Sequence, residues 1–104
     1  MIAVVLLALL SAEPTLEQAQ TCRAHVELLM EDVAKEGKHI AGPTWFIRSW
    51  WDRKGEAAGA PDDDGQAVAL VKAELSRLRT EDGERFQAGR QNCIDTAIEG
   101  GALP

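Results

Sequence analysis

The sequence contains few of the large apolar residues from which a domain core is built. It has no tyrosine and two phenylalanines, and beyond residue 12 only 17 of the remaining 92 residues are Val, Ile, Leu or Phe. With a net charge of −6, this composition lies near the boundary below which chains do not fold unaided. It excludes a multidomain enzyme, a multispan membrane protein and a basic nucleic-acid-binding protein, and it leaves room for one small domain.

The sequence also lacks the short motifs that carry catalysis or hold a cofactor. It contains no Cys-x-x-Cys, no Gly-x-Ser-x-Gly, no His-Glu-x-x-His and no phosphate-binding glycine loop. Cys22 and His25 have a spacing that suits two zinc ligands on one helix, but no second pair completes a site, and His39 stands alone. We therefore expect no catalytic residue, no cofactor and no bound metal, with a small enzyme as a minor alternative.

The acidic run 62–64 before Gly65 resembles part of a calcium loop. With Gly65 at position six of an EF-hand, positions one and twelve are Ala60 and Val71, where carboxylates are required. The EF-hand interpretation therefore fails. The run is better explained as the start of a helix, where negative charge interacts favourably with the helix dipole, and a weak surface cation site is the alternative.

Residues 2–10 form an unbroken apolar run, followed by the small residues Ser11 and Ala12. This is the outline of a cleaved secretory signal, and the run is too short to cross a bilayer as a helix. No Lys or Arg precedes Arg23, unlike the usual basic start of such a signal, and an apolar first helix or strand of the fold is the alternative. We predict a signal peptide over 1–12, a periplasmic or secreted location, and no integral membrane segment after cleavage.

Cys22 and Cys93 are the two cysteines of the chain. In an exported protein we expect them to form a disulfide. The bridge would close a loop of about 72 residues, for which loop-closure entropy predicts a stabilisation of about 4.4 kcal/mol. Two free core thiols are the alternative for a chain that stays inside the cell.

Apolar residues recur at steps of three and four in four segments, which is the periodicity of amphipathic helices. The predicted helices cover residues 16–36, 45–54, 66–79 and 85–98. No alternating strand pattern and no internal repeat occurs. The predicted fold of residues 13–104 is therefore an all-α, four-helix up-down bundle stapled by one disulfide.

Residues that start or stop helices mark the expected boundaries. Thr15 and Thr44 are predicted N-caps of the first two helices, and Gly37 is placed to end the first. Thr80, followed by two acidic residues, indicates the start of the fourth helix. One long kinked helix over the third and fourth segments is the alternative.

The three tryptophans lie within seven residues, at positions 45, 50 and 51. A helical projection places four apolar residues on one face and directs Trp45 elsewhere; the four are Phe46, Ile47, Trp50 and Trp51. In a chain with so few large apolar residues, the simplest interpretation is that this segment supplies the core.

The alternative is that this segment forms an exposed binding patch. Residues 35–54 contain five basic and two acidic residues in a protein of net charge −6, which suits an anionic envelope surface, a glycan or an acidic partner. The candidate patch comprises Lys38, His39, Trp45, Phe46, Arg48, Trp50, Trp51, Arg53 and Lys54.

The sequence thus predicts a small exported helical protein with a non-catalytic interaction or structural role in the cell envelope. The expected partner is an unidentified protein or envelope component and not a nucleic acid. The alternative is an envelope-surface module that binds lipid, peptidoglycan or another glycan through residues 45–54.

Overall fold

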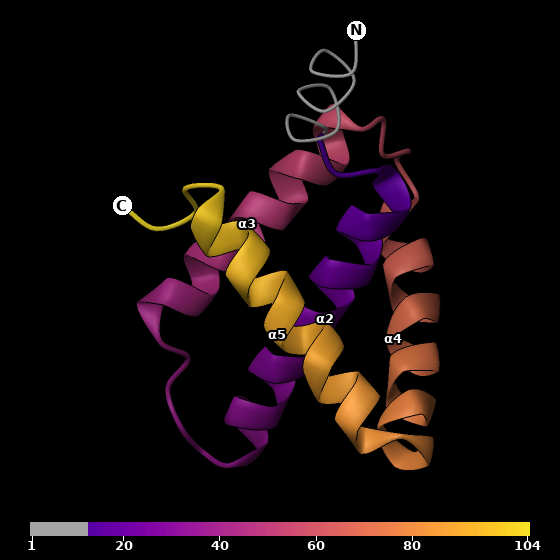
Figure 1. Ribbon diagram of the computed structural model, residues 1–104, viewed down its shortest axis with the longest axis vertical. Coiled ribbons are helices and arrows are strands. Elements are labelled where there is room, and N and C mark those ends of the chain that lie inside the picture. Colours follow the sequence, from indigo (N-terminus) through magenta and orange to yellow (C-terminus); the bar gives the residue numbers. More distant parts are fainter. Residues whose placement is uncertain (1–12) are drawn as a thin grey trace, which may run out of the picture.

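The computed structural model describes residues 13–104, so the predicted signal segment 1–12 lies outside the described residues. The described part of the chain contains helices and no strand. Consecutive helices run in opposite directions, and α5 crosses α2 in the view of Figure 1. The predicted all-α, four-helix bundle is confirmed, with helices α2 Leu16–Lys35, α3 Gly42–Ala57, α4 Asp64–Glu81 and α5 Gly83–Glu99.

Helix α2 begins and ends where the sequence predicts. The Thr15 side chain caps it by accepting a hydrogen bond of 3.0 Å from the backbone N–H of Gln18. Gly37 follows the last turn with φ of +73°, a left-handed conformation that glycine adopts without a Cβ penalty.

Helix α3 starts earlier than predicted. Its N-cap is Ala41, its first residue is Gly42, and Thr44 lies within the first turn. The predicted Thr44 cap is therefore wrong. Pro43 occupies the first turn, where its missing N–H is not needed and its fixed φ is already helical, so the chain becomes helical before the threonine.

Two separate helices follow, and the break between them is at Asp82 rather than at Thr80. Asp82 has extended backbone, with φ of −152° and ψ of 81°, and its carboxylate accepts a hydrogen bond of 3.2 Å from the N–H of Arg85. Thr80 continues α4 and donates its hydroxyl to the carbonyl of Ser76. The prediction that the fourth helix starts at Thr80 is wrong, because Asp82 provides the cap and the extended residue that a new helix start requires.

The core consists of two clusters packed on opposite faces of α2. One face carries Ala19, Cys22, Val26 and Met30 and packs against α3 and the end of the chain. The opposite face carries Ala24 and Leu28, which pack against Val68 and Leu75 of α4 and Phe86 of α5. Positions 24 and 28 lie about half a turn from the first set on a helix of 3.6 residues per turn. Helix α2 is therefore the central helix of the fold.

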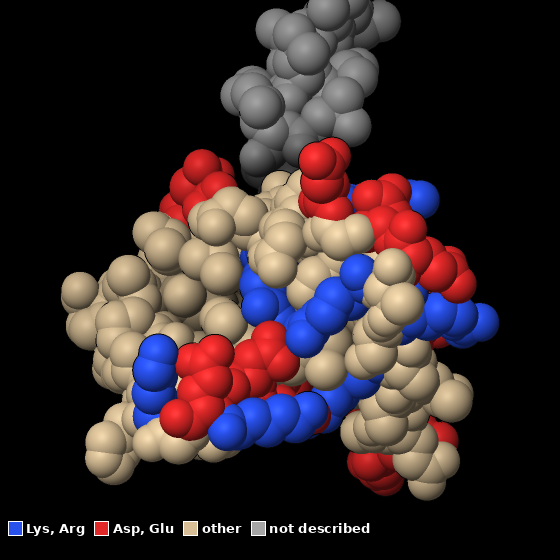
Figure 2. Space-filling model, turned by 90° about the horizontal axis from the view of Figure 1, so that it is seen from below, with Lys and Arg blue, Asp and Glu red and all other residues tan. Residues whose placement is uncertain are grey.

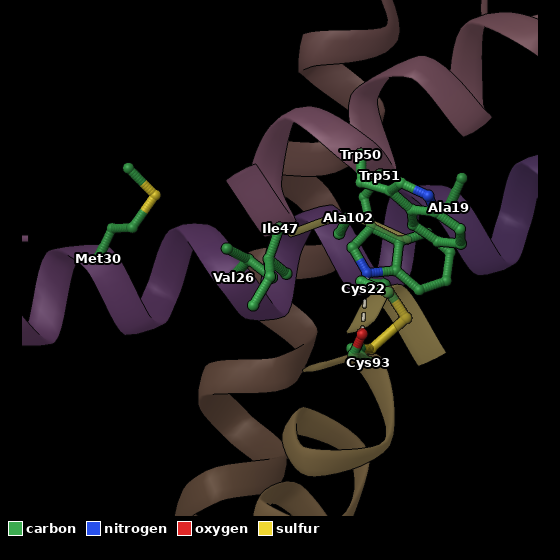
Figure 3. Close-up of a cluster of buried hydrophobic side chains, with 10 residues drawn as sticks. Ala19, Cys22, Val26, Met30, Ile47, Trp50, Trp51, Cys93 and Ala102 are labelled. Atoms are coloured by element: carbon green, nitrogen blue, oxygen red, sulfur yellow. Dashed lines mark hydrogen bonds between the residues drawn. A yellow bond between two sulfur atoms is a disulfide. The ribbon is translucent and has the colours of Figure 1, made fainter. Parts of the chain in front are cut away.

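The predicted disulfide is confirmed. The sulfur atoms of Cys22 and Cys93 are bonded, and their Cα atoms are 5.2 Å apart. The bridge joins α2 to α5 within the tryptophan-rich cluster (Figure 3). Within residues 13–104, no helix combines the length and the apolar composition that a membrane crossing requires.

Candidate functional site

Helix α3 divides its aromatic residues between the core and the surface. Trp50 and Trp51 are buried, whereas Trp45 and Phe46 are 49% and 47% exposed. The helical projection wrongly placed Phe46 on the buried face. The C-terminal turn at Gly100 packs on the Trp50 indole, and Phe46, one helical turn before Trp50, lies beyond that cover.

The two buried indoles have a structural role. Their rings meet edge to face with centroids 4.8 Å apart, an arrangement that aromatic quadrupoles favour. The indole N–H of Trp51 donates a hydrogen bond of 3.0 Å to the carbonyl of Cys93, beside the disulfide (Figure 3). Trp50 and Trp51 thereby join α3 to the bridge between α2 and α5, and the candidate surface is reduced to the start of α3.

A pocket of about 320 Å³ opens beside Trp45 between α2 and α3. We call it the Trp45 pocket, and its lining residues are Glu27, Met30, Glu31, Trp45 and Arg48. It therefore combines one half-exposed indole and a thioether with two carboxylates and a guanidinium. An apolar surface with a few charged hydrogen-bonding groups is the usual composition of a ligand site.

The basic residues predicted for the patch lie mostly in ion pairs within the protein. Arg48 contacts Glu27 at 3.6 Å, Lys38 contacts Glu36 at 3.1 Å, and Lys54 contacts Glu13 at 2.7 Å. Lys54 also lies over the Trp50 ring, 5.1 Å from its centroid. His39 and Arg53 are exposed. Figure 2 shows basic and acidic side chains interleaved on the face seen from below. The local excess of positive charge thus does not form a continuous basic surface.

His25 lies buried between α2 and α5. Its ring is 5.1 Å from that of Phe86, its residue is 3% exposed, and its Nδ1 has no hydrogen-bond partner. Burial, assisted by the nearby Arg90 and Arg79 guanidinium groups, lowers the pKa of His25 to about 4. The imidazole is therefore neutral at pH 7.

The cysteine–histidine metal interpretation of this region has no free thiol to work with. A pocket of about 310 Å³ is lined by the disulfide and His25 together with Thr21, Asn92 and other residues. Because Cys22 is bonded to Cys93, it has no thiolate that could attack a substrate or bind a metal. Among residues 13–104, no group of three or more His, Cys, Asp or Glu side chains is arranged to hold a metal ion.

An ionic cluster that the sequence pattern did not indicate joins α2, α4 and α5. Arg79 donates hydrogen bonds to both oxygens of Asp32, at 3.1 and 3.0 Å, and Arg90 donates a third at 3.1 Å. The two guanidinium groups lie over the Phe86 ring, 4.4 and 4.8 Å from its centroid. Partial burial works against the charge of Asp32, but the arginine hydrogen bonds outweigh it and lower the pKa of this carboxyl. Arg79 and Arg90 lie 47 and 58 residues from Asp32, so no local spacing could reveal the cluster.

The acidic run 62–64 begins helix α4, as expected from its charge. Asp64 is the first helical residue, and Asp63 is the N-cap position without a side-chain hydrogen bond. The Asp64 carboxylate accepts a hydrogen bond of 2.6 Å from the Gln20 amide and lies 3.7 Å from Arg23. The Asp64 side chain therefore connects the start of α4 to α2.

Comparisons of this chain with protein-family models, with curated proteins and with solved structures found no match.

Proposed function

We propose that the protein is an exported, non-catalytic binding protein that contacts its partner through the start of α3. The observation that carries this proposal is the exposure of Trp45 and Phe46. The chain has five Trp and Phe residues, and the other three are buried. A protein with so little apolar material leaves two large rings exposed to solvent at the start of one helix, and exposed aromatic residues of this kind are typical of interaction surfaces.

The surroundings of the pair support a binding role. The next turn of α3 is anchored by Ile47, Trp50 and Trp51 in the core, so the exposed rings are carried by a rigid element. Rigid presentation reduces the entropy lost when a partner binds. The adjoining Trp45 pocket is a shallow depression that opens widely to solvent.

The disulfide supports export. Disulfides persist in oxidising compartments and are rare in the cytosol, and Cys22 and Cys93 are paired here. The proposed location is the periplasm or the extracellular space, with the segment 1–12 removed on the way.

Cross-linking in living cells tests the binding surface. A photoreactive amino acid is placed at Phe46 and, as a control, at Leu70, which is 69% exposed on α4. We expect a discrete covalent adduct from position 46 and none from position 70. Equal labelling at both positions, or no adduct at either, would contradict the proposed surface.

Mass spectrometry of protein from the cell-envelope and culture fractions tests export separately. We expect a chain shortened at its N-terminus that gains one hydrogen per cysteine on reduction. A full-length cytosolic chain with two free thiols would refute the export part of the proposal.

A further inference from the structure

We propose that the Trp45 pocket binds a neutral pyranose ring of a glycan chain. This inference rests on the proposed binding function and specifies the partner class. It follows from three features of the pocket: an exposed aromatic side chain, charged groups that are paired within the protein, and a rigid arrangement of both.

The aromatic face comes from Trp45, whose indole is half exposed at the pocket wall beside Met30. A pyranose ring has apolar C–H faces and a rim of hydroxyl groups. Such a ring can lay one face on an indole while its rim reaches neighbouring polar groups. The pocket volume of about 320 Å³ lies at the small end of ligand sites, in the range suited to a single ring.

The charged groups of the pocket are paired within the protein. Glu27 lies 3.6 Å from Arg48 and accepts a hydrogen bond of 2.8 Å from Arg23. Lys72 reaches from α4 to within 3.7 Å of Glu27 and also pairs with Glu31. An anionic ligand would meet the 45% exposed Glu31 side chain, and a cationic ligand would compete with Lys72 for the same carboxylates.

A neutral ligand rich in hydroxyl groups avoids both the repulsion by Glu31 and the competition with Lys72. A hydroxyl group can donate to a carboxylate and accept from a guanidinium, so it can bind Glu31 and Arg48 without removing either from its ion pair. Hydrogen bonds to charged groups are stronger than those between neutral groups. The pocket therefore discriminates by hydrogen bonding rather than by net charge.

The pocket is also held in place before any ligand arrives. Glu27 and Glu31 are one turn apart on α2, Trp45 and Arg48 are three residues apart on α3, and Lys72 reaches across from α4. Three helices thus fix the polar groups, which lowers the ordering cost of binding.

The test is titration of the purified, oxidised full-length chain with a neutral β-1,4-linked N-acetylglucosamine tetramer and, in parallel, with β-1,4- and α-1,4-linked glucose tetramers. Isothermal titration calorimetry measures binding, and a change in tryptophan fluorescence that is absent in Trp45→Phe reports the environment of Trp45 apart from that of Trp50 and Trp51. We expect saturable binding of at least one tetramer. Trp45→Ala should weaken it by about tenfold or more, as loss of one stacked ring does, and Trp45→Phe should retain most of it.

Further variants separate the polar contribution from folding. Glu31→Gln should weaken binding by about threefold to tenfold through loss of a charged acceptor. Ile98→Ala, an exposed apolar position on α5, should leave binding unchanged. Circular dichroism and thermal unfolding verify that each variant is folded.

Co-sedimentation with purified peptidoglycan distinguishes a cell-wall glycan from a soluble oligosaccharide as the source of the ring. Absence of binding to all three tetramers and to peptidoglycan overturns the inference. Preferential binding to a lysine-rich peptide or to anionic phospholipid vesicles, dependent on Trp45, also overturns it. An adduct from position 46 in the cross-linking experiment would then show that the binding surface survives although the glycan assignment fails.

Discussion

His25 shows how one side chain is shaped by residues far from it in sequence. Its imidazole lies against Gly89, where a Cβ atom would come within 2.9 Å of Nε2, and Phe86 packs on the ring. The sequence placed His25 on a helix three residues from Cys22, a spacing that suits two zinc ligands. The sequence around His25 did not reveal its burial or its arginine neighbours. Helix α5 supplies Phe86, Gly89 and Arg90 from more than 60 residues away.

The folded protein should lose stability as the pH falls from 7 to 5. The unfolded chain protonates His25 below its ordinary pKa of about 6.5, whereas the folded protein, in which burial lowers the pKa of His25 to about 4, does not. Between these values the unfolded state binds more protons, so stability decreases with decreasing pH. The expected loss from pH 7 to 5 is about 2 kcal/mol, measured by urea unfolding at each pH.

The variant His25→Gln separates this effect from other titrating groups. Its free energy of unfolding should vary little over the same range, whatever its value at pH 7. His39→Gln, at the exposed histidine, should keep the wild-type slope. A wild-type stability that stays constant from pH 7 to 5 would contradict the prediction. Below pH 4, protonation of Asp32, whose pKa is lowered by its arginine partners against the effect of partial burial, should destabilise the fold further.

The proposed binding surface could be located from the sequence only in part. The cluster of tryptophans near basic residues was evident, and so was the competition between a core role and a surface role. Which rings lie in the core depends on distant segments: the turn at Gly100 packs on Trp50, and Trp51 donates to the carbonyl of Cys93, whereas Phe46 stays exposed. Whether a cation such as Arg48 is free to contact a ligand depends on its ion-pair partner, here Glu27 on α2.

At the scale of elements, local signals located all four helices but missed two of their starts. Thr15 caps α2 as predicted because its partner, the N–H of Gln18, is three residues away. For α3 and α5 the predicted starts were Thr44 and Thr80, whereas the observed N-caps are Ala41 and Asp82. Pro43 favoured the earlier start for α3, and Asp82 favoured the later start for α5.

The break between α4 and α5 should depend on Asp82 and not on Thr80. Asp82→Ala removes the side chain that accepts from the N–H of Arg85, and loss of such a cap costs about 1 kcal/mol. Thr80→Ala, inside α4, should be neutral or slightly stabilising, because alanine has the higher helix propensity. Denaturant unfolding compares the free energies of unfolding of the two variants. Equal destabilisation by both would count against Asp82 as the cap.

At the scale of the whole molecule, one helix and one covalent bond connect two small cores. Helix α2 contributes to both clusters, and the ionic cluster around Asp32 ties α2 to α4 and α5 beside the second. The disulfide ties α2 to α5 in the first. A chain with so few large apolar residues thus supplements burial with a cross-link and partly buried polar contacts.

Removing the disulfide should therefore cost a large part of the total stability. The double variant Cys22→Ala, Cys93→Ala should lose about 2 to 5 kcal/mol, the range for a native bridge in a small domain. The measurement is urea unfolding of the variant, of the oxidised protein and of the protein in reductant. The variant and the reduced protein should agree, and a midpoint unchanged by reduction would disprove the prediction.

The sequence by itself determined the fold class, the approximate helices and the cysteine pairing, because helical periodicity, most capping and the presence of two cysteines are local or compositional properties. Only the tertiary structure decided that Trp50 and Trp51 are buried while Trp45 and Phe46 face solvent, that the basic residues of α3 are largely paired, and that His25 is neutral. Burial and charge pairing are set by residues that the chain brings together from distant positions. In a core with few large apolar residues, packing by a distant segment decides whether an aromatic ring stabilises the fold or remains available to a partner.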